Sequence, residues 1–376
     1  MKPILCVVGT RPNYMKMAPI LRALDAHVPP LPYVLVHTGQ HYDPAMERVF
    51  FEALGMPTPS HNLAVGAGSH AAQTGEIMKR LDPVIEAHAP GAVLVVGDVN
   101  STLAAALVAA KRGLPVVHVE AGLRSRDRGM PEEINRILVD QLSDLLLTTE
   151  ARAADNLAAE GIGAERVAFV GNTMIDTLET FRDRCTPATR TLAEHGVARL
   201  DAWAPAGYAL VTLHRPSNVD DPATLSDLVG TLEQIAADVP IVFPVHPRTR
   251  GNLERFGLLE RLSDRWLITP PLGYLEMLGL MRDARVVLTD SGGVQEETTV
   301  LGVPCLTLRR NTERPVTVSE GTNQLVGIQR DAILAAWRGL REGGSRHAGK
   351  PALWDGRSAE RIAATLWERR AALGLA

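Results

Sequence analysis

The feature that most constrains the fold of this chain is a regular alternation of short apolar runs with stretches of helical periodicity. Each run is followed by turn residues and then by apolar residues spaced as on one face of a helix. This alternation is typical of βαβ units, in which helices connect parallel strands, so the sequence predicts an α/β fold. The runs lie at residues 4–8, 33–37, 92–96, 116–119, 145–149 and 167–170, and then at 208–213, 241–245, 266–268, 286–288 and 303–308.

The length of the chain predicts two domains. Its 376 residues exceed what one ordinary hydrophobic core accommodates, and residues 186–205, rich in Ala, Pro and Arg, separate the two groups of runs. We predict two doubly wound, Rossmann-like domains that face one another across a cleft, with residues 1–178 in the first and 179–357 in the second. Ligands of such sheets bind outside the carboxyl ends of the strands, so the active site is expected in the interdomain cleft.

Charge and composition exclude several classes of protein. A net charge of −4 argues against a nucleic-acid surface, which needs a basic face. No apolar run approaches the ~18 residues that span a membrane, and no leader pattern precedes the first predicted strand. Three cysteines without CxxC spacing are typical of a reducing cytoplasm, and Cys6 and Cys305 lie within predicted strands as core residues.

The stretch at residues 285–315 contains the strongest candidate ligand site. A predicted buried strand ends at Leu288, and Asp290 and Ser291 follow as candidate helix N-caps. A helix N-terminus that begins at two glycines favours an anion, and an acid one turn later can accept hydrogen bonds from sugar hydroxyls. The residues concerned are Ser291, Gly292, Gly293 and Glu297, followed by Arg309, Arg310 and Arg314. An Asp-Ser cap and a tight turn without a ligand is the alternative, but the acid and the arginines favour a phosphate-and-ribose site.

Charged residues also follow the first-half strands. Arg11 and Lys16 flank the start of a predicted helix, where the helix dipole disfavours cations unless an anion lies between them; a solvated pair is the alternative. Asp98 and Glu120 each follow an apolar run, so they are expected at the same edge of the sheet. The GxGxxA match at residues 66–71 lacks a good preceding strand, so a nicotinamide cofactor has little support.

The segment at residues 131–136 begins a helix whose acidic first turn complements the helix dipole. Glu132 and Arg136 are expected together on the face opposite a buried stripe. Either they form a surface ion pair worth ~0.3–0.5 kcal/mol, or this face borders the cleft. The predicted buried stripe consists of Ile134, Ile137, Leu138 and Leu142.

Three histidines near strands complete the candidates. His118 lies inside a predicted strand and is interpreted as a hydrogen-bonded core residue, and no metal-ligand spacing occurs, so no metal is expected. His214-Arg215 and His246 end two strands, where they suit a diphosphate; ordinary loop hydrogen bonds are the alternative. The pattern as a whole describes a nucleotide-sugar site.

The sequence resembles the non-hydrolysing UDP-N-acetylglucosamine 2-epimerases over nearly its whole length. The matching pieces are GTRP at residues 9–12 with Lys16, TGQH at 38–41, GD at 97–98, HVEAGLR at 118–124, PEEINR at 131–136, HR at 214–215, DSGGVQEE at 290–297 and TERP at 312–315. The resemblance implies a GT-B-like fold, a homodimer, no cofactor, and a C-terminal helix at residues 358–376 that returns to the first domain.

The resemblance also implies a reaction, in which UDP leaves C1 with loss of the C2 proton and then re-adds to 2-acetamidoglucal. Cations stabilise the leaving diphosphate while acids and bases act at C2. The roles carried over are acid–base chemistry for Asp98, Glu120 and Glu132 beside Arg136, diphosphate binding for Arg11, Lys16, His214, Ser291, Gly292, Gly293 and Arg314, and ribose binding for Glu297.

Two departures from the family pattern bear on the substrate. Ser217 stands where the family often has an acid after the His-Arg pair, and Val316 where an acid often follows Glu-Arg-Pro. UDP-N-acetylglucosamine is the expected substrate; a UDP-2,3-diacetamido uronic acid, a GT-B glycosyltransferase and a sugar-nucleotide binding protein are the alternatives. The resemblance further implies a second UDP-N-acetylglucosamine as activator, bound by Gln40 and His41 with Gln73 as a neighbour.

Overall fold

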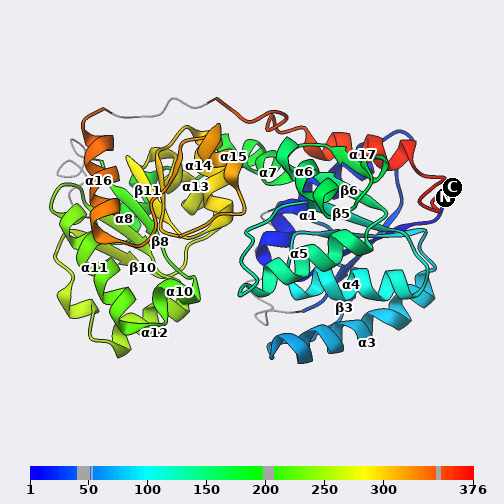
Figure 1. Cartoon of the computed structure of the whole chain (residues 1–376), viewed down its shortest axis with the longest axis horizontal. Helices are drawn as coiled ribbons and strands as arrows, with labels where there is room; N and C mark the ends of the chain where they lie inside the picture. Colours follow the sequence, from blue (N-terminus) through cyan, green and yellow to red (C-terminus); the bar gives the residue numbers. More distant parts are fainter. Residues whose placement is uncertain (40–50, 52–53, 198–206, 344–348) are drawn as a thin grey trace. The chain divides into compact units, whose positions relative to one another are not determined.

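Two parallel β-sheets, one in each of two units of the chain, organise the computed structural model (Figure 1). The structure describes residues 1–39, 51, 54–197, 207–343 and 349–376. Unit 1 consists of Met1–Thr177 together with Ala352–Ala376, and unit 2 consists of Leu178–Pro351.

Within the described residues, the sheet of unit 1 has seven strands in the order β3-β2-β1-β4-β5-β6-β7, and every pairing in it is parallel. The order starts near the middle of the sheet and proceeds outward in both directions, which is the doubly wound arrangement. The strands are β1 (Ile4–Val8), β2 (Tyr33–His37), β3 (His61–Asn62), β4 (Ala92–Val96), β5 (Val116–Ala121), β6 (Leu145–Thr148) and β7 (Val167–Phe169).

Helices connect these strands and cover the sheet of unit 1. They are α1 (Arg11–Ala26), α3 (His70–His88), α4 (Asn100–Lys111), α5 (Pro131–Leu142), α6 (Ala151–Ala159), α7 (Thr173–Phe181), which continues into unit 2, and α17 (Ser358–Glu368). A short 3-10 helix, η1 (Ala164–Arg166), precedes β7. The helices α3, α4 and α5 pack against one another in sequence (Figure 1).

The C-terminal segment completes unit 1. Asp176 of α7 accepts hydrogen bonds from the backbone N–H groups of Ser358 (3.1 Å) and Ala359 (2.6 Å) at the start of α17. The indole of Trp354, which is fully buried, donates to the Thr149 carbonyl at 2.9 Å. The two chain ends lie side by side, and the Lys2 N–H donates to the Leu375 carbonyl (Figure 1).

The part of unit 2 that the structure describes contains a second parallel sheet of six strands in the order β10-β9-β8-β11-β12-β13. Its strands are β8 (Ala209–Thr212), β9 (Ile241–Pro244), β10 (Trp266–Thr269), β11 (Val286–Thr289), β12 (Cys305–Thr307) and β13 (Asn323–Leu325). Its helices are α8 (Ala188–Glu194), α10 (Pro216–Val219), α11 (Pro222–Ala236), α12 (Pro247–Arg255), α13 (Tyr274–Asp283), α14 (Gly292–Leu301), α15 (Pro315–Ser319) and α16 (Arg330–Arg341), with 3-10 helices η2 (Arg182–Arg184) and η3 (Leu259–Arg261).

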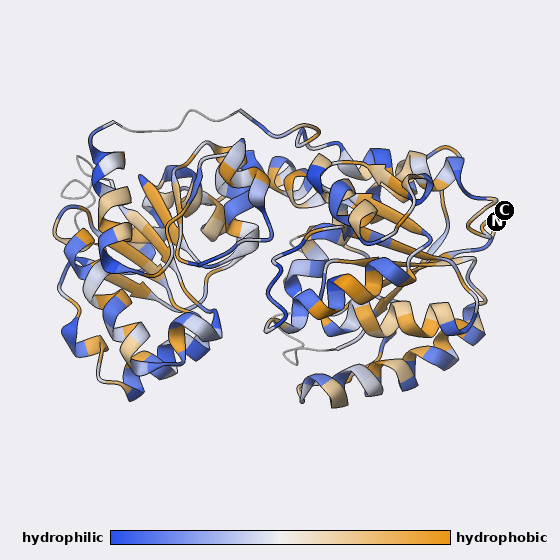
Figure 2. Cartoon of the chain, in the orientation of Figure 1, coloured by the Kyte–Doolittle hydropathy of each residue, from blue (hydrophilic) through white to orange (hydrophobic). Residues whose placement is uncertain are grey.

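Apolar strands explain why both sheets form. Strands β1, β4 and β11 are buried along their whole length, as expected where helices cover both faces of a parallel sheet. Figure 2 shows the strands of both units as predominantly hydrophobic, whereas many helices combine hydrophobic and hydrophilic residues. The predicted α/β fold with two parallel sheets is therefore confirmed.

Two edge strands escaped the sequence prediction. Strand β3 reads His-Asn and β13 reads Asn-Gln-Leu, so neither contains the apolar run by which buried strands are recognised. Both pair with one neighbour only, at the edge of a sheet. These two segments belong to the sheets because of their backbone pairing with a neighbouring strand rather than because of apolar side chains.

The predicted buried stripe of α5 is wrong for Ile134 and Leu138, which are 39% and 44% exposed, whereas Ile137 and Leu142 are half-buried. The buried residues of the helix include Glu133, Arg136 and Asp140. The apolar spacing pointed to the opposite face because ion pairs, which satisfy buried charges, are invisible to hydrophobic periodicity. Helix α5 therefore turns a charged face toward the sheet.

Candidate functional site

In unit 1, Lys16 of α1 and Glu120 at the end of β5 form a buried ion pair. The Lys16 Nζ lies 2.7 Å from Oε1 and 2.6 Å from Oε2 of Glu120, and both side chains are less than a tenth exposed. Gly97 lies directly against this pair, because a Cβ on Gly97 would be 3.2 Å from the Lys16 Nζ. The helix dipole disfavours a cation near the start of α1 unless an anion lies beside it. In this structure the Glu120 carboxylate is the anion beside Lys16.

Glu120 has a strained backbone. Its φ of +74° lies in the left-handed region, which costs a non-glycine residue on the order of 1–3 kcal/mol. The register between β5 and β6 shifts between Val119 and Ala121, so Glu120 occupies a β-bulge. Bulges of this kind re-aim a side chain, and here the carboxylate reaches Lys16. No sequence pattern indicated this conformation.

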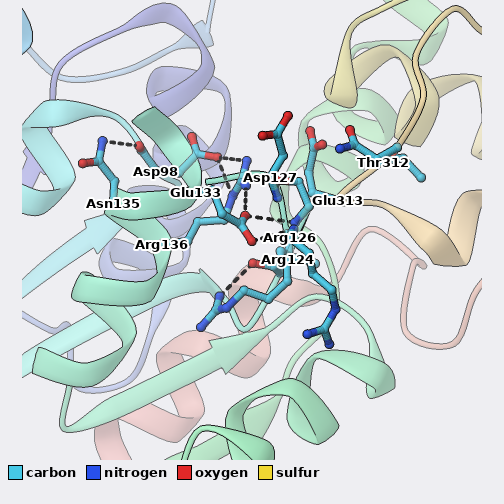
Figure 3. A network of polar contacts seen from close by, with 12 residues as sticks. Asp98, Arg124, Arg126, Asp127, Glu133, Asn135, Arg136, Thr312 and Glu313 are labelled. Carbon is cyan, nitrogen blue, oxygen red and sulfur yellow. Dashed lines mark hydrogen bonds and ion pairs between the residues drawn. The ribbon is translucent and has the colours of Figure 1, made fainter. Parts of the chain in front are cut away.

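A second ion-pair network joins β4 to α5, as Figure 3 shows. Arg136 donates through Nε (2.9 Å) and Nη2 (2.7 Å) to the Asp98 carboxylate, and its Nη1 lies 2.6 Å from Glu133. Glu133 also accepts from the N–H groups of Ser125 and Arg126. The sequence prediction placed Arg136 beside Glu132 and overlooked Glu133, which is the buried carboxylate; its only signal was its place in the PEEINR motif.

Arg11 and Glu132 lie at helix starts of unit 1, and both are half-buried. Arg11 is the first residue of α1, and Glu132 lies in the first turn of α5 beside Pro131. Their predicted roles at the diphosphate and at C2 stay predictions.

His118 is a hydrogen-bonded core histidine, as predicted. It is fully buried within β5, with Nδ1 2.6 Å from Asp140 and Nε2 2.8 Å from the Gly97 carbonyl. Among the residues that the structure describes, no group of three or more His, Cys, Asp or Glu side chains is arranged to hold a metal ion. The three cysteines are free and buried.

In unit 2, α14 begins where β11 ends, and Gly292 and Gly293 form its first turn. The first N–H groups of a helix have no intrahelical acceptor, and together with the helix dipole they favour an anion. Ser291 occupies the N-cap position, but its hydroxyl makes no capping hydrogen bond. A Cβ at Gly292 would lie 2.6 Å from Oε1 of Glu313, so the glycine allows this carboxylate to lie close to the helix start.

Asp290 does not cap α14, contrary to prediction, but holds the segment after β8. Its carboxylate accepts from the N–H groups of His214 and Arg215 and from the Asn218 amide. The His214 Nδ1 lies 2.9 Å from Asp290 Oδ1, and the His214 side chain is 38% exposed. Burial would raise the pKa of Asp290, but the His214 imidazole and the backbone donors outweigh burial and lower it. The exposed imidazole is thereby oriented.

Glu297, one turn into α14, is buried and accepts a hydrogen bond from the Tyr274 hydroxyl at 3.0 Å. Burial raises the pKa of Glu297 to about 7; the Tyr274 hydrogen bond opposes this shift, and the neighbouring charge of Glu296 adds to it. A carboxyl that is partly protonated near neutral pH can donate as well as accept hydrogen bonds.

The arginines after β12 are paired within unit 2. Arg314, only 4% exposed, lies with its Nε 2.5 Å from the Glu296 carboxylate. Arg309 donates to Glu313 at 2.7 Å. The predicted role of Arg314 at a diphosphate stays a prediction, and this buried pairing gives Arg314 a structural role as well.

Only part of the predicted activator site is described. Gln40 and His41 lie outside the described residues. Gln73 is buried in α3, donates to the Gly66 carbonyl at 3.0 Å and accepts from the Asn100 amide at 2.8 Å. Asn135 donates to the Asp98 carbonyl at 2.8 Å and contacts Asn100 at 3.4 Å. A chain of buried amides therefore leads from Gln73 to Asp98.

Comparisons with known proteins agree with these features. The family profile described as UDP-N-acetylglucosamine 2-epimerase matches residues 22–367. The UDP-N-acetylglucosamine 2-epimerase of Methanocaldococcus jannaschii is 43% identical over 336 residues, covering 88% of this chain and 90% of the relative. The UDP-2,3-diacetamido-2,3-dideoxy-D-glucuronate 2-epimerase of Pseudomonas aeruginosa is also 43% identical, over 338 residues, covering 89% and 91%.

A solved structure shows the same architecture. The crystal structure of the M. jannaschii UDP-GlcNAc 2-epimerase in complex with UDP-GlcNAc and UDP superposes with a TM-score of 0.86 at 40% identity, covering 98% of this chain and all of that one. Two doubly wound parallel sheets with charged side chains at their strand ends define the class as a GT-B-like α/β enzyme. The chain belongs to the UDP-N-acetylglucosamine 2-epimerase family and is an isomerase of that family.

No helix within the described residues is long and apolar enough to cross a membrane.

Proposed function

We propose that this chain interconverts UDP-N-acetylglucosamine and UDP-N-acetylmannosamine by elimination and re-addition. The observation that carries the proposal is the set of anchored carboxylates at the strand ends of unit 1, in a chain that is 43% identical to a UDP-N-acetylglucosamine 2-epimerase. The anion-favouring start of α14 in unit 2 supports it further.

The proposed reaction begins with departure of UDP. The C1–O bond breaks, a base removes the C2 proton, and a C1–C2 double bond forms, which gives 2-acetamidoglucal and UDP. A proton then returns to the opposite face of C2 while a UDP oxygen re-adds to C1, so atoms and charge balance without a cofactor. The C2 proton is removable because departure of the anionic diphosphate makes C1 cationic.

We assign the acid–base steps to Asp98, Glu120 and Glu132, with Arg136 beside Asp98. Lys16 neutralises Glu120 in the structure and is available to a diphosphate if Glu120 takes up a proton. The diphosphate is assigned to Arg11, Lys16, His214, Ser291, Gly292, Gly293 and Arg314, and the ribose to Glu297. Preorganised donors at a developing negative charge supply the electrostatic part of such catalysis.

Two partners belong to the proposal. One is a second copy of the chain, as a homodimer, and the other is a second UDP-N-acetylglucosamine that activates the enzyme at Gln40, His41 and Gln73. Pure UDP-N-acetylmannosamine would then convert slowly until a trace of UDP-N-acetylglucosamine is added. Immediate full-rate conversion, unchanged by Gln40→Ala, would remove the activator from the proposal.

The test of the reaction is incubation with UDP-N-acetylglucosamine alone in D2O, followed by product analysis. We expect UDP-N-acetylmannosamine that carries deuterium at C2. Product that retains all of its C2 hydrogen excludes proton loss at C2. Formation of UDP and free N-acetylmannosamine indicates hydrolysis instead, and no turnover without an added acceptor indicates a glycosyltransferase.

One observation supports a second candidate substrate. The P. aeruginosa 2-epimerase of UDP-2,3-diacetamido-2,3-dideoxy-D-glucuronate has the same 43% identity to this chain. The kcat/KM values for the two UDP-sugars, measured side by side, decide between them. We expect the larger value for UDP-N-acetylglucosamine; a larger value for the uronate would assign the chain to that substrate with the same reaction.

A further inference from the structure

His118 has hydrogen-bond acceptors at both of its ring nitrogens. The ring is fully buried in β5, with Nε2 2.8 Å from the Gly97 carbonyl and Nδ1 2.6 Å from Oδ1 of Asp140. A backbone carbonyl can only accept, so Nε2 must carry a hydrogen. Whether Nδ1 also carries one depends on the state of Asp140.

The surroundings of Asp140 keep it ionised. Oδ2 of Asp140 lies 2.7 Å from Nη2 of Arg124 and accepts from the Gly122 N–H at 3.0 Å, while Oδ1 faces His118. Burial would raise the pKa of Asp140, but the His118 and Arg124 contacts outweigh burial and lower it. The Arg124 guanidinium, which stays charged, and the Gly122 N–H favour the ionised carboxylate whatever the state of His118. An ionised Asp140 has no proton to donate, so the hydrogen between the two groups belongs to Nδ1 of His118.

Arg124 pairs with Glu160 (2.6 Å) as well as with the fully buried Asp140, so the three residues and His118 form one cluster. The Glu160 side chain is 28% exposed, so solvent as well as Arg124 compensates its charge. In the described part of unit 1, Glu160 makes no hydrogen bond or ion pair with His118, so it is a suitable control for the pair.

The pair contacts both acid-bearing segments of the unit 1 site. His118 donates to the carbonyl of Gly97, the residue directly before Asp98. Asp140 accepts from the N–H of Gly122, two residues after the bulged Glu120. We propose that His118 and Asp140 form a buried imidazolium–carboxylate pair that acts as a positioning device for Asp98 and Glu120. Its kinetic consequence rests on the proposed function, whereas its protonation state does not.

The protonation state is measured by 15N NMR of the full chain labelled in its histidines, with His118→Gln to assign the resonance. The two ring nitrogens of an imidazolium have nearly equal shifts, whereas those of a neutral ring differ widely. We expect the imidazolium pattern for His118, because each of its ring nitrogens faces an acceptor. A neutral pattern at neutral pH would overturn the pair.

The positioning role is tested with Asp140→Asn. The new amide can keep its oxygen toward Arg124 and Gly122 and turn its NH2 toward Nδ1, which converts His118 to the neutral tautomer without removing it. We expect kcat to fall by about 10- to 100-fold, as on loss of a group that orients reacting residues, while KM stays within about 2-fold. Glu160→Gln is the matched control, since it removes a charge from the same cluster but leaves both His118 contacts; its kcat should stay within about 2-fold.

A readout without turnover separates this inference from the proposed function. The backbone amide resonances of Asp98 and Glu120 should shift in Asp140→Asn and stay in place in Glu160→Gln. If no UDP-sugar is turned over but these shifts and the imidazolium pattern are found, the proposed function fails and the pair stands. If Asp140→Asn keeps full turnover, or leaves both amides in place, the positioning role is wrong. Should Asp140→Asn not fold, His118→Gln, which retains one donor toward Gly97, takes its place with the same two readouts.

Discussion

The strand ends of unit 1 and unit 2 hold charge in different ways. In unit 1, carboxylates such as Asp98 and Glu120 each face a cation, Arg136 or Lys16, at salt-bridge distance. In unit 2, the helix start at Gly292 offers backbone N–H groups, and the Glu297 carboxyl is held partly protonated by burial. Paired side chains suit proton transfer at fixed positions, whereas backbone donors suit binding of an anion. This difference agrees with the proposed division of roles, in which unit 1 performs the chemistry and unit 2 binds the nucleotide.

The largest expected effect comes from Asp98→Asn in unit 1. Loss of one acid–base group should lower kcat by about 10²- to 10⁴-fold, while the affinity for UDP stays unchanged because UDP is assigned mainly to unit 2. Steady-state kinetics and calorimetric titration with UDP measure the two quantities. Asp155→Asn, which replaces an exposed acid of α6, is the control and should change neither. A parallel loss of UDP affinity would break the division between the units.

The protonated carboxyl of unit 2 predicts a pH-dependent stability. Below pH 4.5, the ordinary pKa of a glutamate, Glu297 is protonated in both the folded and the unfolded chain. Between pH 4.5 and about 7, only the unfolded chain releases the proton, so the free energy of unfolding falls as pH rises and then levels off. The full loss is about 3 kcal/mol.

The variant Glu297→Gln removes this loss. Its free energy of unfolding should approach that of the parent near pH 4.5 and exceed it at about pH 8 by up to about 3 kcal/mol. Denaturant titrations at several pH values measure the difference. Glu260→Gln, at an exposed acid in the same unit, should show no such trend. A difference that is independent of pH would mean that folding does not raise the pKa of Glu297.

Two glycine substitutions, one in each unit, are expected to affect stability and UDP binding differently. A Cβ at Gly9 of unit 1 would lie 2.0 Å from the Ser101 Oγ and 2.8 Å from the Thr38 Oγ1, so Gly9→Ala should cost about 1–3 kcal/mol of stability. A Cβ at Gly292 would lie 2.6 Å from Oε1 of Glu313, whose side chain is buried and paired with Arg309. Gly292→Ala should therefore lower the melting temperature less than Gly9→Ala, because one side-chain end rather than two close neighbours must move, but it should weaken UDP binding about 10-fold, equivalent to one lost hydrogen bond. Equal melting and equal affinity for the two variants would contradict this assignment.

The smallest effect is expected on the exposed side of α5. Leu138→Ala, at a residue that is 44% exposed, should change the free energy of unfolding by no more than ~0.5 kcal/mol. Val139→Ala, at the fully buried neighbour, should cost about 2 kcal/mol. Denaturant titrations compare the two. A large loss for Leu138→Ala would instead indicate that a second protein chain covers this side of the helix.

The sequence predicts those features of the fold that are determined by neighbouring residues in the chain. The buried strands were predictable because each is an apolar run, and Gly302 was predictable as the end of α14, where its φ is +74°. The strands β3 and β13 were not, because edge pairing needs no apolar run.

The sequence indicated which charged residues belong to the site, but it did not indicate which of them contact one another. Asp98 and Glu120 stood out because they follow predicted strands, whereas the buried role of Glu133 and the left-handed bulge at Glu120 depend on contacts between distant segments. Apolar spacing likewise misplaced Ile134 and Leu138, since a helix that buries ion pairs exposes residues that periodicity assigns to the core.

The insertion of unit 2 between two segments of unit 1 has a consequence for synthesis on the ribosome. The chain leaves the ribosome from its N-terminus, so α1–α7 emerge before unit 2, and Trp354 and α17 emerge last. At a translation rate of about 5–20 residues per second, unit 1 waits on the order of 10–40 s for its final segment. During that interval Asp176 lacks the N–H donors of Ser358 and Ala359, and the buried site of Trp354 is open. Unit 2 is therefore synthesised in full before unit 1, although synthesis of unit 1 begins first.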